Sequence, residues 1–298
     1  AIKHLRGKKF ELFPDFQTGG MIDVTHYSEG KRGGKVKVRA HIEELDKKIL
    51  VIRDVPYGVT TAQLMDSIVK ANDQGKIKIK KVTDNTAANV EVHVDLAPGI
   101  STDITIDALY AFTDCEVSIS PNACIIAEQK PRFITVHDLL RSSAELTKDL
   151  LKKELEIKLA ELQDKWHYTS LEKIFFEEKI YKELEKKHET WEKVLMAIDK
   201  AFVPFKKQLK KEISEEDIVK LTEKPVRRIY KLDIDELNEQ IKNIDKEIKQ
   251  VKYDLDNLTD FAVAYYENLL KKYGKGRERK TELKLFESIQ AKQVAIAN

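Results

Sequence analysis

The first third of the chain alternates short apolar runs with turn residues, at the two-residue period of half-buried strands. Four such runs predict strands of a mixed sheet, at residues 35–39, 49–52, 77–80 and 90–94. Two segments with helical apolar spacing, 60–72 and 102–112, begin at Thr or Ser positions that suit a helix cap. The first part of the chain is therefore expected to be an α+β domain.

After Pro131 the composition changes abruptly, because Lys, Glu and Leu dominate and no glycine follows until Gly274. We place a domain boundary near Pro131. A helical pattern begins at Val136 and continues through Trp166 without a Pro or Gly to stop it. This pattern predicts a single helix of about thirty residues.

A second long helix is predicted from an apolar seam whose spacings alternate between three and four residues, as in a coiled coil. The seam consists of Ile234, Leu237, Ile241, Ile244, Ile248, Val251, Leu255 and Leu258. Further helical pattern, interrupted at Pro204 and Pro225, separates the two helices and is too long for a turn and too apolar for a linker. It predicts an antiparallel coiled-coil arm with a helical head, and a last helix over 260–273 in the head or its return. A generic helical bundle fits the same pattern.

The charge and cysteine content narrow the possible partners and compartment. Charged residues make up 35% of the chain, but the formal net charge is only +2, so any DNA-binding surface has to be local. Cys115 and Cys124 are too few for a disulfide framework and predict reduced, buried thiols in a cytoplasmic protein. No apolar run approaches the roughly 20 residues that span a bilayer, so no membrane contact is expected.

Catalytic and metal-binding signatures are not found in the sequence. It contains no phosphate-binding loop, no His-Glu-x-x-His motif and no nucleophile elbow. The seven histidines are scattered, without partners at metal-ligand spacing. We therefore expect no catalytic residue, no metal site and no cofactor within this chain.

Residues 30–39 form a glycine-rich basic loop that leads into a predicted strand. The two-residue period places Lys35, Lys37 and Arg39 on one face, where they and Arg32 are candidates to contact a row of DNA phosphates. A solvated edge strand protected by lysine is the alternative. A second basic stretch, 271–281, contains glycines that mark a helix stop and is interpreted as a solvated linker.

Met21 and Ile22 follow Gly19 and Gly20, where a flexible backbone would let one apolar side chain protrude. An exposed apolar residue beside a basic strand suits a wedge between base pairs. Either residue is therefore a candidate for DNA intercalation. The start of a buried strand is the alternative.

Four segments, in this order, resemble the A subunit of the bacterial type IIA topoisomerases DNA gyrase and topoisomerase IV. Residues 13–22 are similar to the family's Gly-Pro-Asp-Phe-Pro-Thr-x-x-x-Ile stretch, although Phe13 and Gln17 replace its Gly and Pro. Residues 32–40 resemble Gly-Arg-Gly-Lys-Val-x-x-Arg-Ala. Two further elements agree, at 55–59 with Ile-Pro-Tyr-x-Val and at 109–122 with Leu-Tyr-x-x-Thr-x-Leu-x-x-Ser-x-x-x-Asn.

The resemblance spans nearly the whole chain and implies a mixed α/β tower followed by a coiled-coil arm that ends in a dimerisation head. The implied parts are a DNA-contacting lead-in (1–34), a tower (35–131), an arm (132–166 and 230–273), a C-gate head (167–229) and a return segment (274–298). Candidate residues for the dimer gate are Trp191, Leu195, Ile198 and Phe202.

The resemblance also implies that the full-length protein is an isomerase that cleaves a DNA duplex through a tyrosine, passes a second duplex and reseals the first. That tyrosine is expected upstream of Ala1, which would leave this fragment inactive alone. The implied partners are DNA, a second copy of the chain and a B subunit that carries Mg²⁺ and ATP. The alternative is a non-enzymatic coiled-coil adaptor or scaffold.

Overall fold

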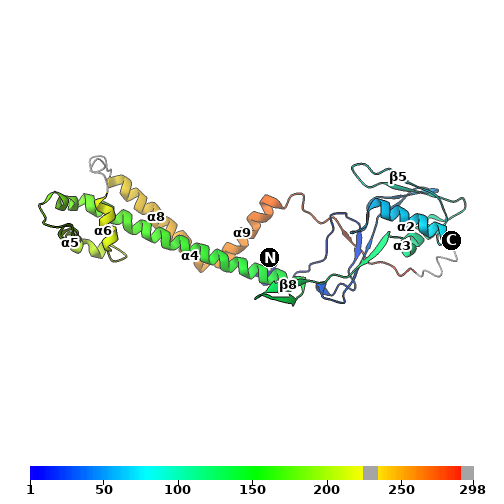
Figure 1. The fold of residues 1–298 in the computed structure, drawn as a ribbon, viewed down its shortest axis with the longest axis horizontal. Helices are drawn as coiled ribbons and strands as arrows, with labels where there is room; N and C mark the ends of the chain where they lie inside the picture. Colours follow the sequence, from blue (N-terminus) through cyan, green and yellow to red (C-terminus); the bar gives the residue numbers. More distant parts are fainter. Residues whose placement is uncertain (224–233, 290–298) are drawn as a thin grey trace.

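A computed structural model describes residues 1–223 and 234–289 and shows an elongated molecule (Figure 1). A β-rich body, residues 13–133 together with 279–289, lies at one end and is called the tower. Two long helices form the arm in the middle, and residues 167–223 form a helical head at the far end. Helices and sheets thus segregate along the chain, in agreement with the predicted α+β class.

The larger sheet of the tower is antiparallel, in the order β3-β4-β6-β5. Its strands are β3 (Ile42–Asp46), β4 (Ile49–Ile52), β5 (Ile79–Asp84) and β6 (Val92–Leu96). Two helices pack on one face of this sheet, α2 (Thr61–Asp73) and α3 (Thr102–Phe112). Thr60 begins α2 with a capping box, as the sequence predicted. The core between the layers includes Leu50, Ile52, Leu64 and Leu109, all fully buried.

The mixed sheet expected from the sequence is in fact two sheets, and the strand predicted over 35–39 lies in the second. This sheet has the order β10-β1-β2-β7, with β10 (Glu282–Leu283), β1 (Met21–Asp23), β2 (Val36–Arg39) and β7 (Glu116–Ile119). Strand β2 is central, so the lysine-protected edge strand considered as an alternative is wrong. Only β1 and β10 pair in parallel within this sheet.

A two-stranded hairpin, β8 (Cys124–Ala127) and β9 (Lys130–Phe133), is the part of the tower that lies next to the arm. Pro131 therefore lies in a strand, and the long helix α4 (Val136–Glu177) begins a few residues later. The Thr135 hydroxyl caps this helix by accepting the backbone N–H of Asp138 at 2.9 Å. The helix has 42 residues, longer than predicted, because its apolar face continues from the arm into the core of the head.

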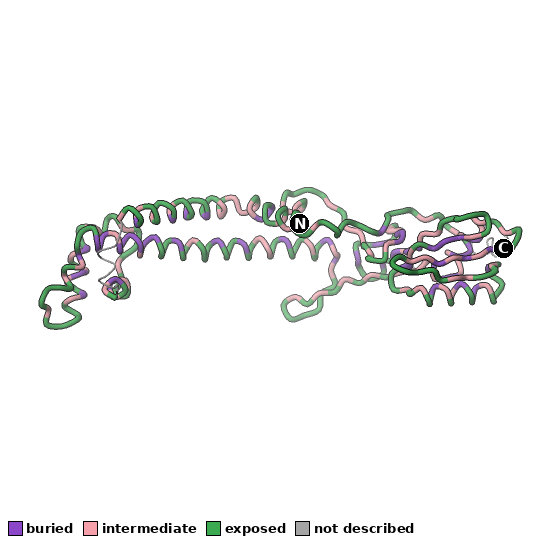
Figure 2. The backbone as a smooth tube through the Cα atoms, turned by 90° about the horizontal axis from the view of Figure 1, so that it is seen from above, coloured by how far each residue is buried: buried purple, intermediate pink, exposed green. Residues whose placement is uncertain are grey.

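The arm consists of α4 and α8 (Ile234–Asp256), which run antiparallel and pack along their lengths (Figure 2). The predicted seam faces α4, since Ile244, Ile248 and Val251 are buried against Leu155, Leu162 and Trp166. The last helix, α9 (Leu258–Tyr273), packs on α4 and on the short α1 (Ile2–Leu5), so it belongs to the return and not to the head.

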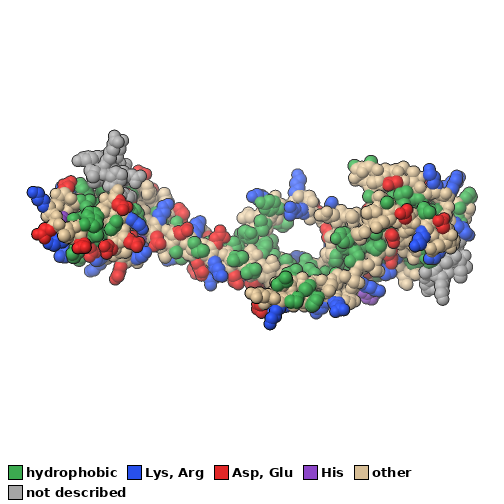
Figure 3. All heavy atoms as spheres, viewed as in Figure 1, with side chains coloured by type: hydrophobic (Ala, Val, Ile, Leu, Met, Phe, Trp, Pro, Cys, Tyr) green, Lys and Arg blue, Asp and Glu red, His purple; other side chains and the backbone are tan. Residues whose placement is uncertain are grey.

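The head contains η2 (Ile180–Glu185), α5 (Trp191–Phe202), η3 (Val203–Gln208) and α6 (Glu215–Thr222) around the end of α4. Acidic and basic side chains are interspersed over the head and the arm (Figure 3), as expected for solvated helices. Pro225, the predicted division between residues 229 and 230, and the end of the return segment (290–298) lie outside the described residues.

The two cysteines differ from each other. Cys115 is buried, and burial raises the pKa of its thiol to about 12. Cys124 is exposed on β8, so the prediction of two buried thiols is wrong for this residue. Within residues 1–223 and 234–289, no helix is long and apolar enough to cross a membrane.

Candidate nucleic-acid interface

The basic loop that precedes β2 is held tightly against the start of the arm. Ser28 and Glu29 adopt left-handed backbone angles, with φ of 50° and 52°. At Gly30, φ is 81° and a Cβ atom would lie 2.8 Å from Cγ2 of Val136, so the position requires glycine. The carbonyl of Gly30 also accepts the backbone N–H of Ala123 at 2.9 Å. The loop is thus fixed to the base of α4 and to the segment before β8.

Lys31, Arg32 and Lys35 are exposed cations of this loop, and the last two are the predicted DNA contacts. Neither forms an ion pair with any residue in the part of the chain that the structure describes. Their charges are therefore available to an anion in solution. Of the four predicted phosphate contacts, these two have the accessibility that a DNA backbone requires.

Lys37 and Arg39 share one face of β2, as the two-residue period predicted, but both point toward the same carboxylate. Arg39 Nε lies 2.6 Å from Glu116 Oε2, and Lys37 Nζ lies 2.8 Å from Glu116 Oε1. Glu116 occupies β7, directly opposite Arg39 in the register. The single carboxylate offsets one of the two positive charges, which weakens the attraction of this face for phosphates.

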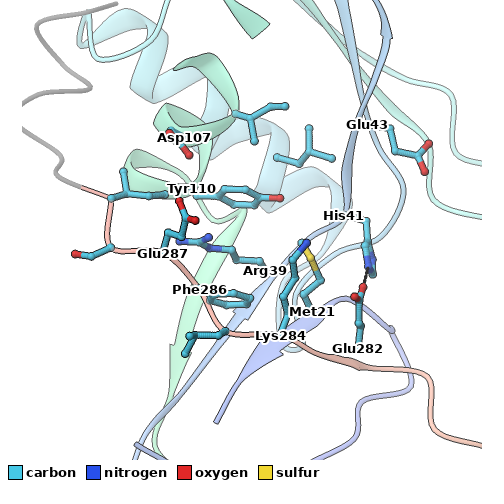
Figure 4. A pocket seen from close by; sticks show the side chains of 15 residues that line it. Met21, Arg39, His41, Glu43, Asp107, Tyr110, Glu282, Lys284, Phe286 and Glu287 are labelled. Carbon is cyan, nitrogen blue, oxygen red and sulfur yellow. Dashed lines mark hydrogen bonds and ion pairs between the residues drawn. The ribbon is translucent and has the colours of Figure 1, made fainter. Parts of the chain in front are cut away.

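Arg39 is also buried, with 8% of its surface exposed. Its guanidinium carbon lies 4.6 Å from the ring centre of Tyr110 and 4.3 Å from that of Phe286, in cation–π contacts (Figure 4). Phe286 comes from the return segment, so this arginine connects three distant parts of the tower. In this conformation Arg39 cannot contact DNA directly.

The two wedge candidates lie on opposite faces of β1. Ile22 is fully buried with Tyr27, Val36 and Val38. Met21 is 7% exposed and lines a hollow of about 660 Å³ beside Arg39 (Figure 4). Neither side chain protrudes, so insertion into DNA would first require β1 to open. The arrangement corresponds to the buried strand start that the sequence left as an alternative.

The return segment is attached to the tower by a set of hydrogen bonds around Thr281. Its hydroxyl accepts the backbone N–H of Phe16 at 2.8 Å, and its own N–H donates to Asp15 Oδ1 at 2.9 Å. The backbone N–H of Glu282 then donates to the carbonyl of Gly20 at 2.9 Å. Thr281 is almost fully buried. These hydrogen bonds hold the return segment against β1, the strand that follows Gly19 and Gly20.

His41 forms a second attachment between the tower and the return segment. Its Nδ1 lies 2.6 Å from Asp54 Oδ2, and its Nε2 lies 3.3 Å from Glu282 Oε2 (Figure 4). Partial burial by itself would lower the pKa of His41, but the hydrogen bonds and the charges of Asp54 and Glu282 outweigh it. The pKa of His41 is therefore raised above its ordinary value.

This raised pKa predicts a pH-dependent contribution to stability. The protonated imidazole is favoured in the folded state, so the contribution is fully present below the ordinary pKa of about 6.5 and is lost as pH rises through the raised pKa. Thermal unfolding of the protein and of His41→Gln should differ most near pH 6 and least near pH 9. The matched control, exposed His26→Gln, should show no such trend. A difference for His41→Gln that grows with pH would contradict this role.

The four gate candidates occupy different environments in the head. Leu195, Ile198 and Phe202 are buried in its core, whereas Trp191 is 53% exposed. Two apolar neighbours that the sequence did not single out, Met196 and Val203, are 57% and 56% exposed. They are seven residues apart and lie on one side of α5 and its extension. The most exposed large apolar side chains of the head are thus Trp191, Met196 and Val203. Trp191 lies on a different side of α5 from Met196, so we call only Met196 and Val203 the head surface.

The comparisons with known proteins identify the family. Residues 1–269 match the profile of the A subunit of DNA gyrase/topoisomerase IV. The whole chain is 37% identical to the A subunit of DNA topoisomerase 4 from Borreliella burgdorferi, of which it covers 47%. About half of the chain (52%) is 27% identical to 20% of the A subunit of DNA gyrase from Chlamydia pneumoniae. The chain therefore belongs to the family of DNA gyrase and topoisomerase IV A subunits, and it spans about half the length of the first of these relatives.

The residues that the sequence missed share one property. Glu116 and Phe286 contact Arg39 of the predicted strand, and Glu282 contacts His41 just after it, all from segments far away in the chain. Residues 1–223 and 234–289 contain no group of three or more His, Cys, Asp or Glu side chains that could hold a metal ion.

Proposed function

We propose that this chain supplies two mechanical parts of the breakage-reunion subunit of an ATP-dependent type II DNA topoisomerase, either topoisomerase IV or gyrase. The observation that carries the proposal is the family match over residues 1–269. The tower grips and helps to bend the gate duplex, and the head pairs with a second copy of the chain. Cleavage by a tyrosine, and Mg²⁺ and ATP on a partner B subunit, are functions of the whole enzyme outside these parts.

The grip on DNA rests on the exposed cations at the base of the arm. Arg32 and Lys35 are unpaired within the described residues and stand on a loop that glycine packing and backbone hydrogen bonds hold in one conformation. A rigid cationic loop binds phosphates with little loss of conformational entropy. Arg39 serves this surface indirectly, because it fixes β2 against β7 and the return segment.

The proposed contact with DNA is tested by replacing the two predicted phosphate contacts that are exposed, Arg32 and Lys35. Arg32→Ala combined with Lys35→Ala is expected to weaken binding to a duplex. The slope of log K against log salt should become shallower by about 0.9 for each phosphate that the variant no longer neutralises. The measurement is fluorescence anisotropy of a labelled duplex over a salt series. Arg39 is left in place, since its removal would leave Glu116 with less compensation and confuse binding with folding.

The matched control is a variant in which two exposed lysines of α8 are replaced, Lys246→Ala and Lys249→Ala. It loses the same two positive charges, but on the arm. Its salt slope should equal that of the unchanged chain. An adaptor with no role in DNA binding would show equal slopes for all three proteins. That result would contradict the proposed grip.

The dimer gate rests on the head surface. Met196 and Val203 expose apolar side chains on one side of a small domain whose other large apolar residues, apart from the exposed Trp191, are mostly buried or half-buried. Aromatic residues and methionine are enriched in protein interfaces. A modest apolar surface of this kind favours a contact that forms and opens reversibly, as the passage of a duplex requires.

A further inference from the structure

The edge strand β5 carries a second basic surface, separate from the loop at residues 30–35. The tower holds five lysines and a single aspartate between residues 70 and 81, although the whole chain has a net charge of only +2. Strand β5 lies at the edge of the larger sheet, paired only with β6. In Figure 1 it lies on the side of the tower away from β8, near which the loop is fixed.

Three of these lysines, Lys78, Lys80 and Lys81, are exposed. None of them has an ion-pair partner within residues 1–223 and 234–289. The outer face of the same sheet is different, because Arg53 pairs with both Glu43 and Glu91. The three lysines thus form a cluster of like charges, and Asp95, opposite Lys81 in the register of β6, makes no ion pair with them.

The local backbone explains why neighbouring lysines point outward. The pairing of β5 with β6 shifts register between Ile79 and Lys81, which marks a β-bulge. A bulge interrupts the strict alternation of side chains and redirects them. Lys80 and Lys81 are consequently both exposed, although a regular strand would turn one of them toward the core.

The spacing and chemistry of this surface suit a nucleic-acid backbone. Lys78 immediately precedes β5 and lies two residues from Lys80, and residues two apart in extended backbone are separated by about 6.6 Å. This is close to the rise of two nucleotides along the DNA axis, at about 3.4 Å each. Lysines contact phosphates without reading bases. An edge strand also offers backbone N–H groups that the sheet does not use. These features favour a duplex over a compact anion.

We propose that Lys78, Lys80 and Lys81 form a second, sequence-independent contact of the tower with the DNA phosphate backbone. The inference rests on the proposed function, and it assigns to β5 a part of the duplex that the loop does not reach. The alternative occupant of an edge strand is another strand. In that case the lysines would only prevent edge-to-edge association.

The test is a triple variant, Lys78→Gln, Lys80→Gln and Lys81→Gln, with Lys246→Gln, Lys249→Gln and Lys252→Gln on α8 as the matched control. Duplex affinity is measured by anisotropy over a salt series with two unrelated sequences. The β5 variant should bind both duplexes at least roughly tenfold more weakly, with a slope shallower by up to about 2.7. The control should bind like the unchanged chain.

Four outcomes separate the possibilities. Equal weakening for both sequences with unchanged molar mass supports the proposal. Unchanged affinity, with or without new self-association of the β5 variant, overturns it and leaves edge protection as the role of these lysines. If the loop variant loses affinity and the β5 variant does not, only this inference fails. If the unchanged chain does not bind DNA at all, the proposed function fails as well.

Discussion

Replacing Phe202 by alanine is expected to lower the free energy of unfolding of the head by about 3–5 kcal/mol. Phe202 is fully buried at the end of α5 and stacks on Phe175 of α4, with ring centres 6.4 Å apart and planes at 12°. The core of the head is small, so the cavity left by the ring would remove a large share of its packing. The loss should appear in urea unfolding followed by circular dichroism.

Leu184→Ala in η2 provides the control, because Leu184 is exposed (38%) and lies outside the head surface. Surface substitutions of this kind usually change stability by no more than about 0.5 kcal/mol. Similar losses for both variants would contradict the assignment of Phe202 to the core. A dimer that dissociates when Phe202 is replaced, with no loss of stability, would return this residue to the gate.

Replacing Ile22 by alanine is expected to destabilise the tower by about 2–5 kcal/mol. Ile22, in the middle of β1, is fully buried against Val36 and Val38 of β2. The strand that holds it also receives the return segment, since the N–H of Lys284 donates to the carbonyl of Ile22 at 3.0 Å. Replacing Ile22 should therefore weaken both the packing of β1 on β2 and the contact of β1 with the return segment. Thermal unfolding measures the loss of stability.

The control is Ile126→Ala on the β8–β9 hairpin, where the side chain is 83% exposed and its loss should have little effect. DNA bending is measured on the same proteins by energy transfer between the ends of a duplex. A wedge role predicts the opposite pattern for Ile22→Ala, with bending abolished and stability kept. That pattern would contradict the buried position.

The elements predicted from the sequence are those with a local signal. The apolar seam at Ile244, Ile248 and Val251 repeats within one helix, and the capping box at Thr60 lies within four residues. Such patterns need no information from the rest of the chain. Strand β10 has two residues and pairs with β1 from about 260 positions away, so no local pattern could indicate it.

Only part of the candidate site could be predicted, because some of its contacts depend on residues far away in the sequence. The two-residue period correctly placed Lys37 and Arg39 on one face, but the carboxylate that binds them comes from β7 through the register of the sheet. The same limit applies to α5. The spacing of Leu195, Ile198 and Phe202 shows that they share a face, but not whether that face meets its own chain or another copy. The family match does not decide this either, since it places segments and not contacts.

The most direct test of the two-part mechanical role is the molar mass of the chain in solution, measured by light scattering over a concentration series. A gate formed by the head surface predicts a concentration-dependent dimer with a mass near twice 34.4 kDa. Met196→Glu combined with Val203→Glu should shift it to the monomer, while the circular dichroism of the folded chain stays the same and unfolding no longer depends on protein concentration. A strict monomer at every concentration would contradict a head that pairs two copies of this chain.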